Sequence, residues 1–202
     1  MRPLNANASP LNLTHQMHPT LQKLREGDRR SIGRSNEVVS EVLSNPRLFH
    51  VVFSGLSADD PLIRIRSADA VEKITAQRPE FLRSYKNTLI RDLAATAQKE
   101  VRWHVAQMLP RLELNEDERR RVFRVLLSYL NDTSSIVRTF AMQALADIAR
   151  DSAALLPSVR QHLAELTITG TPAMRARGRK LLTSLSGLTA RSTATRRKRR
   201  AR

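Results

Sequence analysis

Four arginines recur along the chain at nearly even spacing. Arg64, Arg102, Arg138 and Arg175 are separated by 38, 36 and 37 residues. A guanidinium group offers several donors in a planar fork that fits a carboxylate or a phosphate. A repeated arginine could therefore grip a partner's phosphates or carboxylates, or it could bond one repeat to the next within the fold. Both interpretations require that the four residues, called here the arginine ladder, line one edge of a regular structure.

A second group of cations lies at the C-terminal end. Residues 166–202 hold 11 of the 35 Lys and Arg residues and no acid, so they carry +11 of the formal net charge of +16. Such a run could bind nucleic acid, a ribosome or an anionic membrane, or serve as a nuclear-import signal. The alternative is a solvated helix face followed by a solubilising tail. The polyanion-binding candidates are Arg175, Arg177, Arg179, Lys180, Arg196, Arg197, Lys198, Arg199, Arg200 and Arg202.

Residues that could do other chemistry are few. The sole tryptophan, Trp103, is either a partner anchor or a packing residue between repeats. The chain has no Cys, and its five His residues are scattered, with His15 and His18 in an irregular N-terminal region. Clustered carboxylates at 59–60 and 116–118 stand at expected helix starts, where acids suit the helix dipole. We therefore expect no catalytic residue, no metal site, no cofactor and no enzymatic activity.

The ladder arginines belong to longer repeated segments. Each segment begins with an apolar residue directly before the arginine and continues with apolar or small residues at i+4, i+7, i+8 and i+11. This spacing marks one face of an α-helix. The four segments span residues 63–74, 101–112, 137–148 and 174–185, and a weaker fifth copy runs through Ser31, Ser35, Val38, Val39 and Val42.

A second set of helices is expected between these segments, at Pro46–Leu56, Pro79–Thr96, Glu116–Leu130 and Ala153–Leu166. Helix-start signals precede several of the expected helices, namely Asn45-Pro46, Asp60-Pro61, Thr171-Pro172 and the capping-box pair Asn115 and Glu118. Gly187 is expected to end the last helix. Each unit is thus a helical hairpin, repeated about every 37 residues.

The segment that contains Asp132, Val137, Arg138, Ala141, Ala144, Leu145 and Ile148 resembles a HEAT repeat, and the likeness extends over roughly residues 28–187. It implies an all-α fold, a right-handed α-α superhelix (armadillo-like, HEAT-like solenoid) of about four to five helical hairpins. The C-terminal tail is basic and rich in Ser, Thr, Ala and Arg without an apolar period, so it is expected to be disordered. The expected domains are an irregular segment at 1–18, the solenoid at 19–187 and the tail at 188–202. One departure concerns the acid that precedes the ladder arginine: only the third copy has an Asp six residues before it.

The resemblance implies a non-enzymatic scaffold that mediates protein–protein interaction, with a basic end able to contact polyanions. One alternative is a nucleic-acid-binding solenoid that contacts DNA or RNA backbone with little sequence specificity. A third reading is a DNA glycosylase-like enzyme on the same scaffold, although no matching aromatic and acidic constellation is found. No membrane span or signal peptide is recognised, so the expected location is cytoplasmic, or nuclear or nucleoid-associated through the tail. The protein partner and the oligomeric state stay open.

Overall fold

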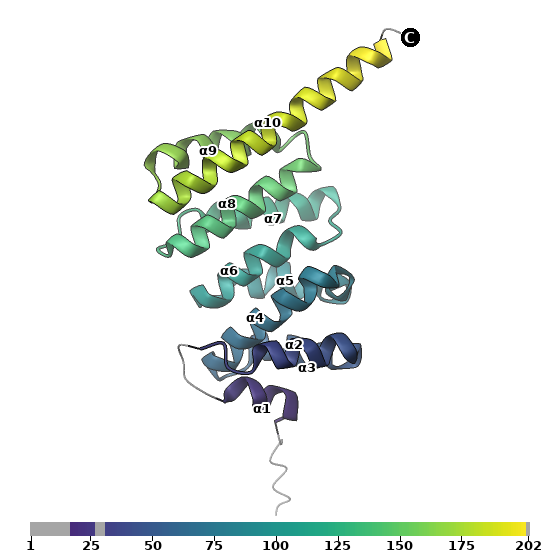
Figure 1. Cartoon of the computed structure of the whole chain (residues 1–202), viewed down its shortest axis with the longest axis vertical. Helices are drawn as coiled ribbons and strands as arrows, with labels where there is room; N and C mark the ends of the chain where they lie inside the picture. The colour runs from purple at the N-terminus through teal and green to yellow at the C-terminus, as the bar shows by residue number, and fades with distance from the viewer. Residues whose placement is uncertain (1–16, 27–30, 201–202) are drawn as a thin grey trace, which may run out of the picture.

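A computed structural model describes residues 17–26 and 31–200, with side chains through residue 187 (Figure 1). All regular structure in these residues is helical. The α-helices are α1 (Pro19–Arg25), α2 (Ser35–Ser44), α3 (Phe49–Ser54), α4 (Pro61–Gln77), α5 (Lys86–Arg91), α6 (Lys99–Met108), α7 (Glu116–Tyr129), α8 (Ser135–Arg150), α9 (Leu156–Thr169) and α10 (Pro172–Arg200). Short 3-10 helices are η1 (Pro46–Leu48), η2 (Gly55–Ser57), η3 (Pro79–Tyr85), η4 (Leu93–Ala95) and η5 (Leu109–Arg111).

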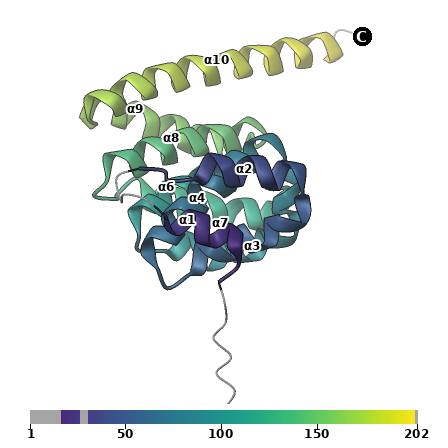
Figure 2. The same ribbon diagram turned by 60° about the horizontal axis from the view of Figure 1, so that its bottom comes forward.

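The helices form two layers. The even-numbered helices α2, α4, α6, α8 and α10 pack side by side in chain order, and the odd-numbered helices cover one side of that layer (Figures 1 and 2). The four repeated segments lie in α4, α6 with η5, α8 and α10, and the weaker copy lies in α2. Their leading apolar residues Ile63, Val101, Val137 and Met174 are all fully buried. The all-helical repeat architecture predicted from the periodicity is therefore confirmed.

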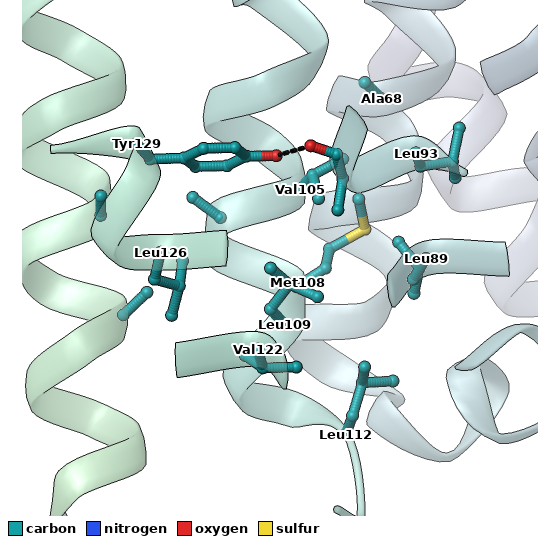
Figure 3. Close-up of a cluster of buried hydrophobic side chains, with 14 of the residues drawn as sticks. Ala68, Leu89, Leu93, Val105, Met108, Leu109, Leu112, Val122, Leu126 and Tyr129 are labelled. Carbon is teal, nitrogen blue, oxygen red and sulfur yellow. Dashed lines mark hydrogen bonds between the residues drawn. The ribbon is translucent and has the colours of Figure 1, made fainter. Parts of the chain in front are cut away.

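The core runs continuously between the layers. Figure 3 shows one part of it, where side chains from α5, α6, η5 and α7 meet, with Leu89, Met108 and Leu126 fully buried. Tyr129 brings a polar group into this region, and its hydroxyl donates to the Ala94 carbonyl at 2.7 Å. Each hairpin thus buries its apolar stripe against its neighbours, which is how a repeat too small to fold alone is stabilised.

The predicted caps form at Asp60 and Asn115, whereas the Asn45 side chain makes no capping bond before η1. Asp60 accepts a hydrogen bond from the Leu62 N–H at 2.8 Å before the first turn of α4. Asn115 and Glu118 form a reciprocal capping box at α7, with bonds of 2.9 and 2.8 Å. These bonds satisfy backbone donors that the first helical turn leaves unpaired.

The odd-numbered layer is less regular than expected. The expected helix at Pro79–Thr96 is divided into η3, α5 and η4, and the expected helix at Pro46–Leu56 into η1, α3 and η2. The apolar residues Leu82, Leu89 and Leu93 are nevertheless buried. The local change to the tighter 3-10 winding therefore leaves the core contacts in place.

The last helix is longer than expected. It was expected to end at Gly187, followed by a disordered tail, but α10 continues through Gly187 to Arg200 and projects beyond the other helices (Figures 1 and 2). Gly187 does not have a positive φ, and apart from its chain neighbours and the backbone of its own helix no atom lies within 4 Å of where its Cβ would stand. No proline follows Pro172, and Arg and Ala favour helix, so the sequence holds no strong stop there. Residues 1–16, including His15, lie outside the described residues.

Across residues 17–26 and 31–200, none of the helices combines the length and the apolar character needed to cross a membrane.

Candidate binding surface

The first ladder arginine bonds its own repeat to the next. Arg64 donates from one terminal nitrogen to the carbonyls of Ala58 and Asp59 at 2.7 and 3.0 Å. Its Nε donates to Oε1 of Gln98, at 2.8 Å, on the loop that starts the next repeat. Arg64 is thus held by the loop before its own helix and by one side chain of its neighbour, which matches the structural interpretation of the ladder.

The second ladder arginine has the same arrangement with a carboxylate. Arg102 donates to the Thr96 carbonyl, at 3.0 Å from Nε, and forms an ion pair with Asp132 in the next repeat. The Asp132 side chain is only 2% exposed, and its second oxygen accepts from the Ser134 N–H at 2.7 Å. The Arg102 guanidinium also lies 5.5 Å from the ring centre of Tyr129. Asp132 is the acid that precedes the ladder arginine in the third copy, and it pairs with Arg102 of the second copy.

The last two ladder arginines differ. Within the described part of the chain, no residue accepts a hydrogen bond from the Arg138 guanidinium, and its Nε is buried without a partner. Arg175 is exposed, and no acid of the described residues pairs with it. The ladder is thus bonded at its first two positions and open at its last two.

A groove opens on the side of the even-numbered layer that the odd-numbered helices leave uncovered. It has a volume of about 420 Å³ and is lined by Gln107, Pro110, Arg111, Phe140, Gln143, Ala144, Asp147 and Arg177. All of these residues belong to α6, η5, α8 and α10. Sequence reasoning missed this groove, although the spacing of Phe140, Gln143 and Asp147 places the three on one helix face opposite the buried stripe.

Hydrogen bonds between helices fix the groove's polar residues. Arg177 donates to Oε1 of Gln143 at 2.8 Å, and the Gln143 amide donates to both Asp147 oxygens at 3.0 and 3.1 Å. Arg111 pairs with Glu72 and donates to its carbonyl at 2.7 Å. These bonds join α10 to α8 and η5 to α4 around the groove.

The C-terminal polyanion-binding candidates differ in exposure and in contacts. Arg175, Arg179 and Lys180 are exposed, whereas Arg177 turns toward Gln143 and lines the groove. Arg196, Arg197, Lys198, Arg199 and Arg200 belong to α10, but their side chains lie outside the described set, and Arg202 lies wholly outside it.

Trp103 and His104 occupy the middle of the even-numbered layer. Trp103 is partly buried and packs against the core, and its ring centre lies 5.6 Å from that of His104. His104 has a buried Nδ1 without a partner, and burial lowers its pKa below the ordinary value of 6.5. The role of Trp103 as a partner anchor stays a prediction.

One buried arginine escaped the sequence analysis. Arg66 is 1% exposed and donates to the carbonyls of Leu24 and Ser31 at 2.9 and 3.3 Å, and also to that of Glu26. It therefore satisfies the carbonyl end of α1 and the loop that follows. Its position two residues after Arg64 gave no signal, because its partners are 35 to 42 residues away.

One acid of each carboxylate cluster caps a helix, Asp60 at α4 and Glu118 at α7. Among the residues with described side chains, no group of three or more His, Asp or Glu gathers in a way that could hold a metal ion.

Comparison with known proteins supports the fold and adds no function. No family model and no curated protein matches the chain. The structure is similar to the crystal structure of an engineered protein from the Northeast Structural Genomics Consortium, with a TM-score of 0.58 and 17% sequence identity. The match covers 84% of this chain and 78% of that chain. At this identity the likeness concerns the fold alone, and the chain is an all-helical repeat solenoid.

Proposed function

We propose that this protein is a non-enzymatic, HEAT-like scaffold that binds a protein partner on the uncovered side of its even-numbered layer. The groove across α6, α8 and α10 is the observation that carries this proposal. It is lined by the polar residues Gln107, Asp147 and Arg177 together with the partly buried Phe140. An aromatic residue surrounded by a polar rim is the usual composition of a protein-binding hot spot.

Two features support the HEAT-like assignment of the repeats. An apolar residue followed by the ladder arginine opens each of the four clear copies, and the Arg102–Asp132 pair joins the second copy to the third. Repeats of this kind stack into extended surfaces on which no single residue performs chemistry. The catalytic alternative has less support, since one acid of each carboxylate cluster, Asp60 and Glu118, is used as a helix cap.

The test is affinity capture from native lysate with the immobilised full chain. Gln107→Arg places a longer, charged side chain in the groove, and Gln161→Arg makes the same change at an exposed position on α9. We expect one protein to be retained by the wild type and by Gln161→Arg, and to be reduced by at least about tenfold with Gln107→Arg. Retention of no specific protein, or equal retention by both variants, would contradict the proposal.

A second candidate function is polyanion binding by α10. Arg175, Arg179 and Lys180 are exposed, and no acid of the described residues pairs with any of them. The last acidic residue in the sequence is Glu165, so no acid follows along the projecting helix. A field of one sign attracts polyanions and loses strength as salt rises.

Electrophoretic shifts with duplex DNA and with RNA over rising salt test this candidate. The triple change of Arg175, Arg179 and Lys180 to Gln should make the negative slope of log K against log salt shallower by about 2 to 3 units. The matched control changes Arg47, Arg91 and Arg124, which are exposed cations elsewhere, to Gln. Equal slopes for the two triple variants would remove α10 from the binding surface.

A further inference from the structure

The groove across α6, α8 and α10 contains one cation that has no acid beside it. Arg177 is partly buried and donates to the neutral Oε1 of Gln143 at 2.8 Å, and among the described side chains no acid lies within ion-pair distance of it. Arg111, which also lines the groove, is by contrast paired with Glu72. A guanidinium that meets only a neutral acceptor attracts an anion more strongly than one that is already paired.

The acid that lines the groove is engaged by other groups. Asp147 accepts from the Gln143 amide on both oxygens, at 3.0 and 3.1 Å, and its Oδ1 lies 3.6 Å from Nε of Arg150. Gln143 thus stands between Asp147 and Arg177, so these two opposite charges are linked through an amide rather than paired directly. The positive charge of Arg177 is left over, and a negatively charged ligand would complement the groove.

A second cation stands beside Arg177 on the same face of α10. Gln107 and Gln143, which line the groove, each stand five residues after the ladder arginine of their helix, and Lys180 has the same position in α10. Lys180 also stands three residues after Arg177, so the two side chains are neighbours on the helix surface. Lys180 is exposed, and no acid of the described residues pairs with it. The face of α10 that continues the groove is therefore positive.

The apolar part of the groove lies between α6 and α8. Phe140 on α8 shares the groove with Gln107 and Pro110. The Gln107 amide donates to the carbonyl of Trp103 in its own helix at 3.3 Å, and Gln107 makes no hydrogen bond to any residue of α8, all of which are described. The boundary between α8 and α10 is joined at the corresponding place by Arg177. The space beside Phe140 is therefore open to a side chain of a partner.

We propose that the groove binds an acidic segment of the partner protein, with an apolar side chain between Gln107 and Phe140 and carboxylates at Arg177 and Lys180. This inference rests on the proposed function, because it gives the chemical class of the partner for the same groove. Packed helices lie about 8–10 Å apart and an extended chain advances about 3.3 Å per residue, so the acids should stand about three residues from the apolar residue. A nucleic-acid backbone would leave Phe140 uncovered, so the apolar lining favours a peptide.

A display library of random short peptides identifies the ligand chemistry. The library is selected against the immobilised full chain, and enriched peptides are synthesised and titrated. We expect a class with Asp or Glu about three residues from Leu, Ile, Val or Phe. Its affinity should fall at least about tenfold when the acids are replaced by Asn or Gln, and it should also fall as salt rises. Enriched peptides whose affinity does not depend on their acids would overturn the inference.

Removal of charge from two faces of α10 tests where the carboxylates bind. Arg177→Gln combined with Lys180→Gln should lower the affinity of the enriched peptide at least about tenfold. The matched control combines Arg175→Gln with Arg179→Gln, two exposed positions that lie about 200° around the helix from Arg177. The control should change the affinity less than about twofold. Equal losses for the two double variants would overturn the proposed contacts in favour of a diffuse positive field.

Lys180 also allows a test without a change in packing. Arg177 joins α10 to α8, whereas Lys180 is exposed and bonds to no described residue, so Lys180→Gln leaves the groove intact. Loss of one peptide acid and Lys180→Gln should be non-additive by at least about threefold in affinity. Arg177→Lys keeps the charge without the planar fork and should recover part of the affinity that Arg177→Gln loses. Additive effects of Lys180→Gln with every peptide acid would contradict the contact.

The outcomes separate this inference from the function on which it rests. Gln107→Arg should weaken an acidic peptide as well, because it fills the place of the apolar side chain. Enriched peptides that lack an acid and still respond to Gln107→Arg would overturn the acidic ligand and leave the scaffold standing. Enrichment of no peptide would count against both. DNA binding that falls with Arg177→Gln and Lys180→Gln, without any acidic peptide, would overturn the inference in favour of a phosphate site.

Discussion

Arg102 reaches across the boundary between two repeats and pairs with Asp132, a carboxylate that is almost fully buried. Asp132 also accepts from the Ser134 N–H, so one side chain joins α6 of one repeat to the start of α8 in the next. We expect Asp132→Ala to lower the free energy of unfolding by about 1–3 kcal/mol, because the Arg102 guanidinium would lose its carboxylate partner. Chemical denaturation measures the change.

The matched control for that substitution is Asp117→Ala. Asp117 is 85% exposed, and its carboxylate lies 3.7 Å from Arg120 on the same helix. An exposed ion pair contributes little, so its loss should cost less than about 0.5 kcal/mol. Equal destabilisation by the two substitutions would show that the Arg102–Asp132 pair does not join the repeats.

Arg66 should be essential for the packing of the N-terminal helices α1 and α2. Its guanidinium is the donor for carbonyls at the end of α1 and in the following loop, and the side chain has almost no contact with solvent. Arg66→Met removes these donors and should cost about 2–4 kcal/mol, with hydrogen exchange rising first in α1. Arg66→Lys keeps the charge but lacks the planar fork, so it should recover only part of the stability. Full stability of either variant would contradict the capping role.

Gly33 should tolerate no side chain. It has a φ of 54°, in the left-handed region that favours glycine, and an added Cβ would lie 2.7 Å from Cζ of Arg66. Gly33→Ala should therefore destabilise the packing of α1 and α2 by about 1–3 kcal/mol, through backbone strain and through displacement of Arg66. The measurement is thermal unfolding beside Arg66→Met and the control Gly187→Ala, whose added Cβ would meet no other side chain or helix within 4 Å. A Gly33→Ala protein as stable as the wild type would contradict this geometry.

Stability should fall in mild acid because of His104. Burial lowers the pKa of His104, so below its unfolded pKa of 6.5 the unfolded chain binds the proton more readily than the folded one. The groups that face it include the acids Asp69 and Glu72, which favour the charged form, and the cations Lys73 and Arg111, which oppose it. The contribution is fully present above pH 6.5 and is lost as the pH falls through 6.5 toward the lowered value.

The variant His104→Phe tests this dependence. The equivalent position in the next repeat is Phe140, so the larger ring has a precedent in the fold. Unfolding free energies measured from neutral to mildly acidic pH should decline less steeply for His104→Phe than for the wild type. Parallel curves for the two proteins would show that His104 does not cause the acid sensitivity.

The buried hydroxyl of Tyr129 should contribute through one hydrogen bond. Tyr129 is 3% exposed and its hydroxyl has the Ala94 carbonyl as acceptor, while burial raises its pKa above the ordinary value of 10. Tyr129→Phe keeps the ring and should cost about 1–2 kcal/mol, since the carbonyl would lose its donor. Tyr129→Ala should cost about 3–5 kcal/mol because it also leaves a cavity. Similar losses for both variants would show that the hydroxyl, rather than ring packing, accounts for the effect.

The repeats could be predicted because their signal is local. Apolar positions such as Val101 and Val105 recur with helical spacing, and the caps Asp60 and Asn115 lie beside the helices that they start. Such patterns depend on residues within one helical turn, which a single sequence displays directly.

The contacts that define the candidate sites could not be predicted in the same way. Arg177 with Gln143, and Arg111 with Glu72, join residues that are 34 and 39 positions apart. Which polar residues meet depends on the offset between stacked helices, and composition does not encode that offset. The end of α10 was misjudged for a different reason, since Gly187 lacks the positive φ that would make it a helix stop.

The central claim is that the uncovered side of the even-numbered layer binds a protein. Hydrogen exchange of the full chain, with and without the protein captured by the wild type, tests it most directly. The binding function predicts slowed exchange in α6 and α8 around Gln107 and Phe140, with little change in α5 and α7. Protection confined to α5 and α7, or to α10 alone, would contradict it.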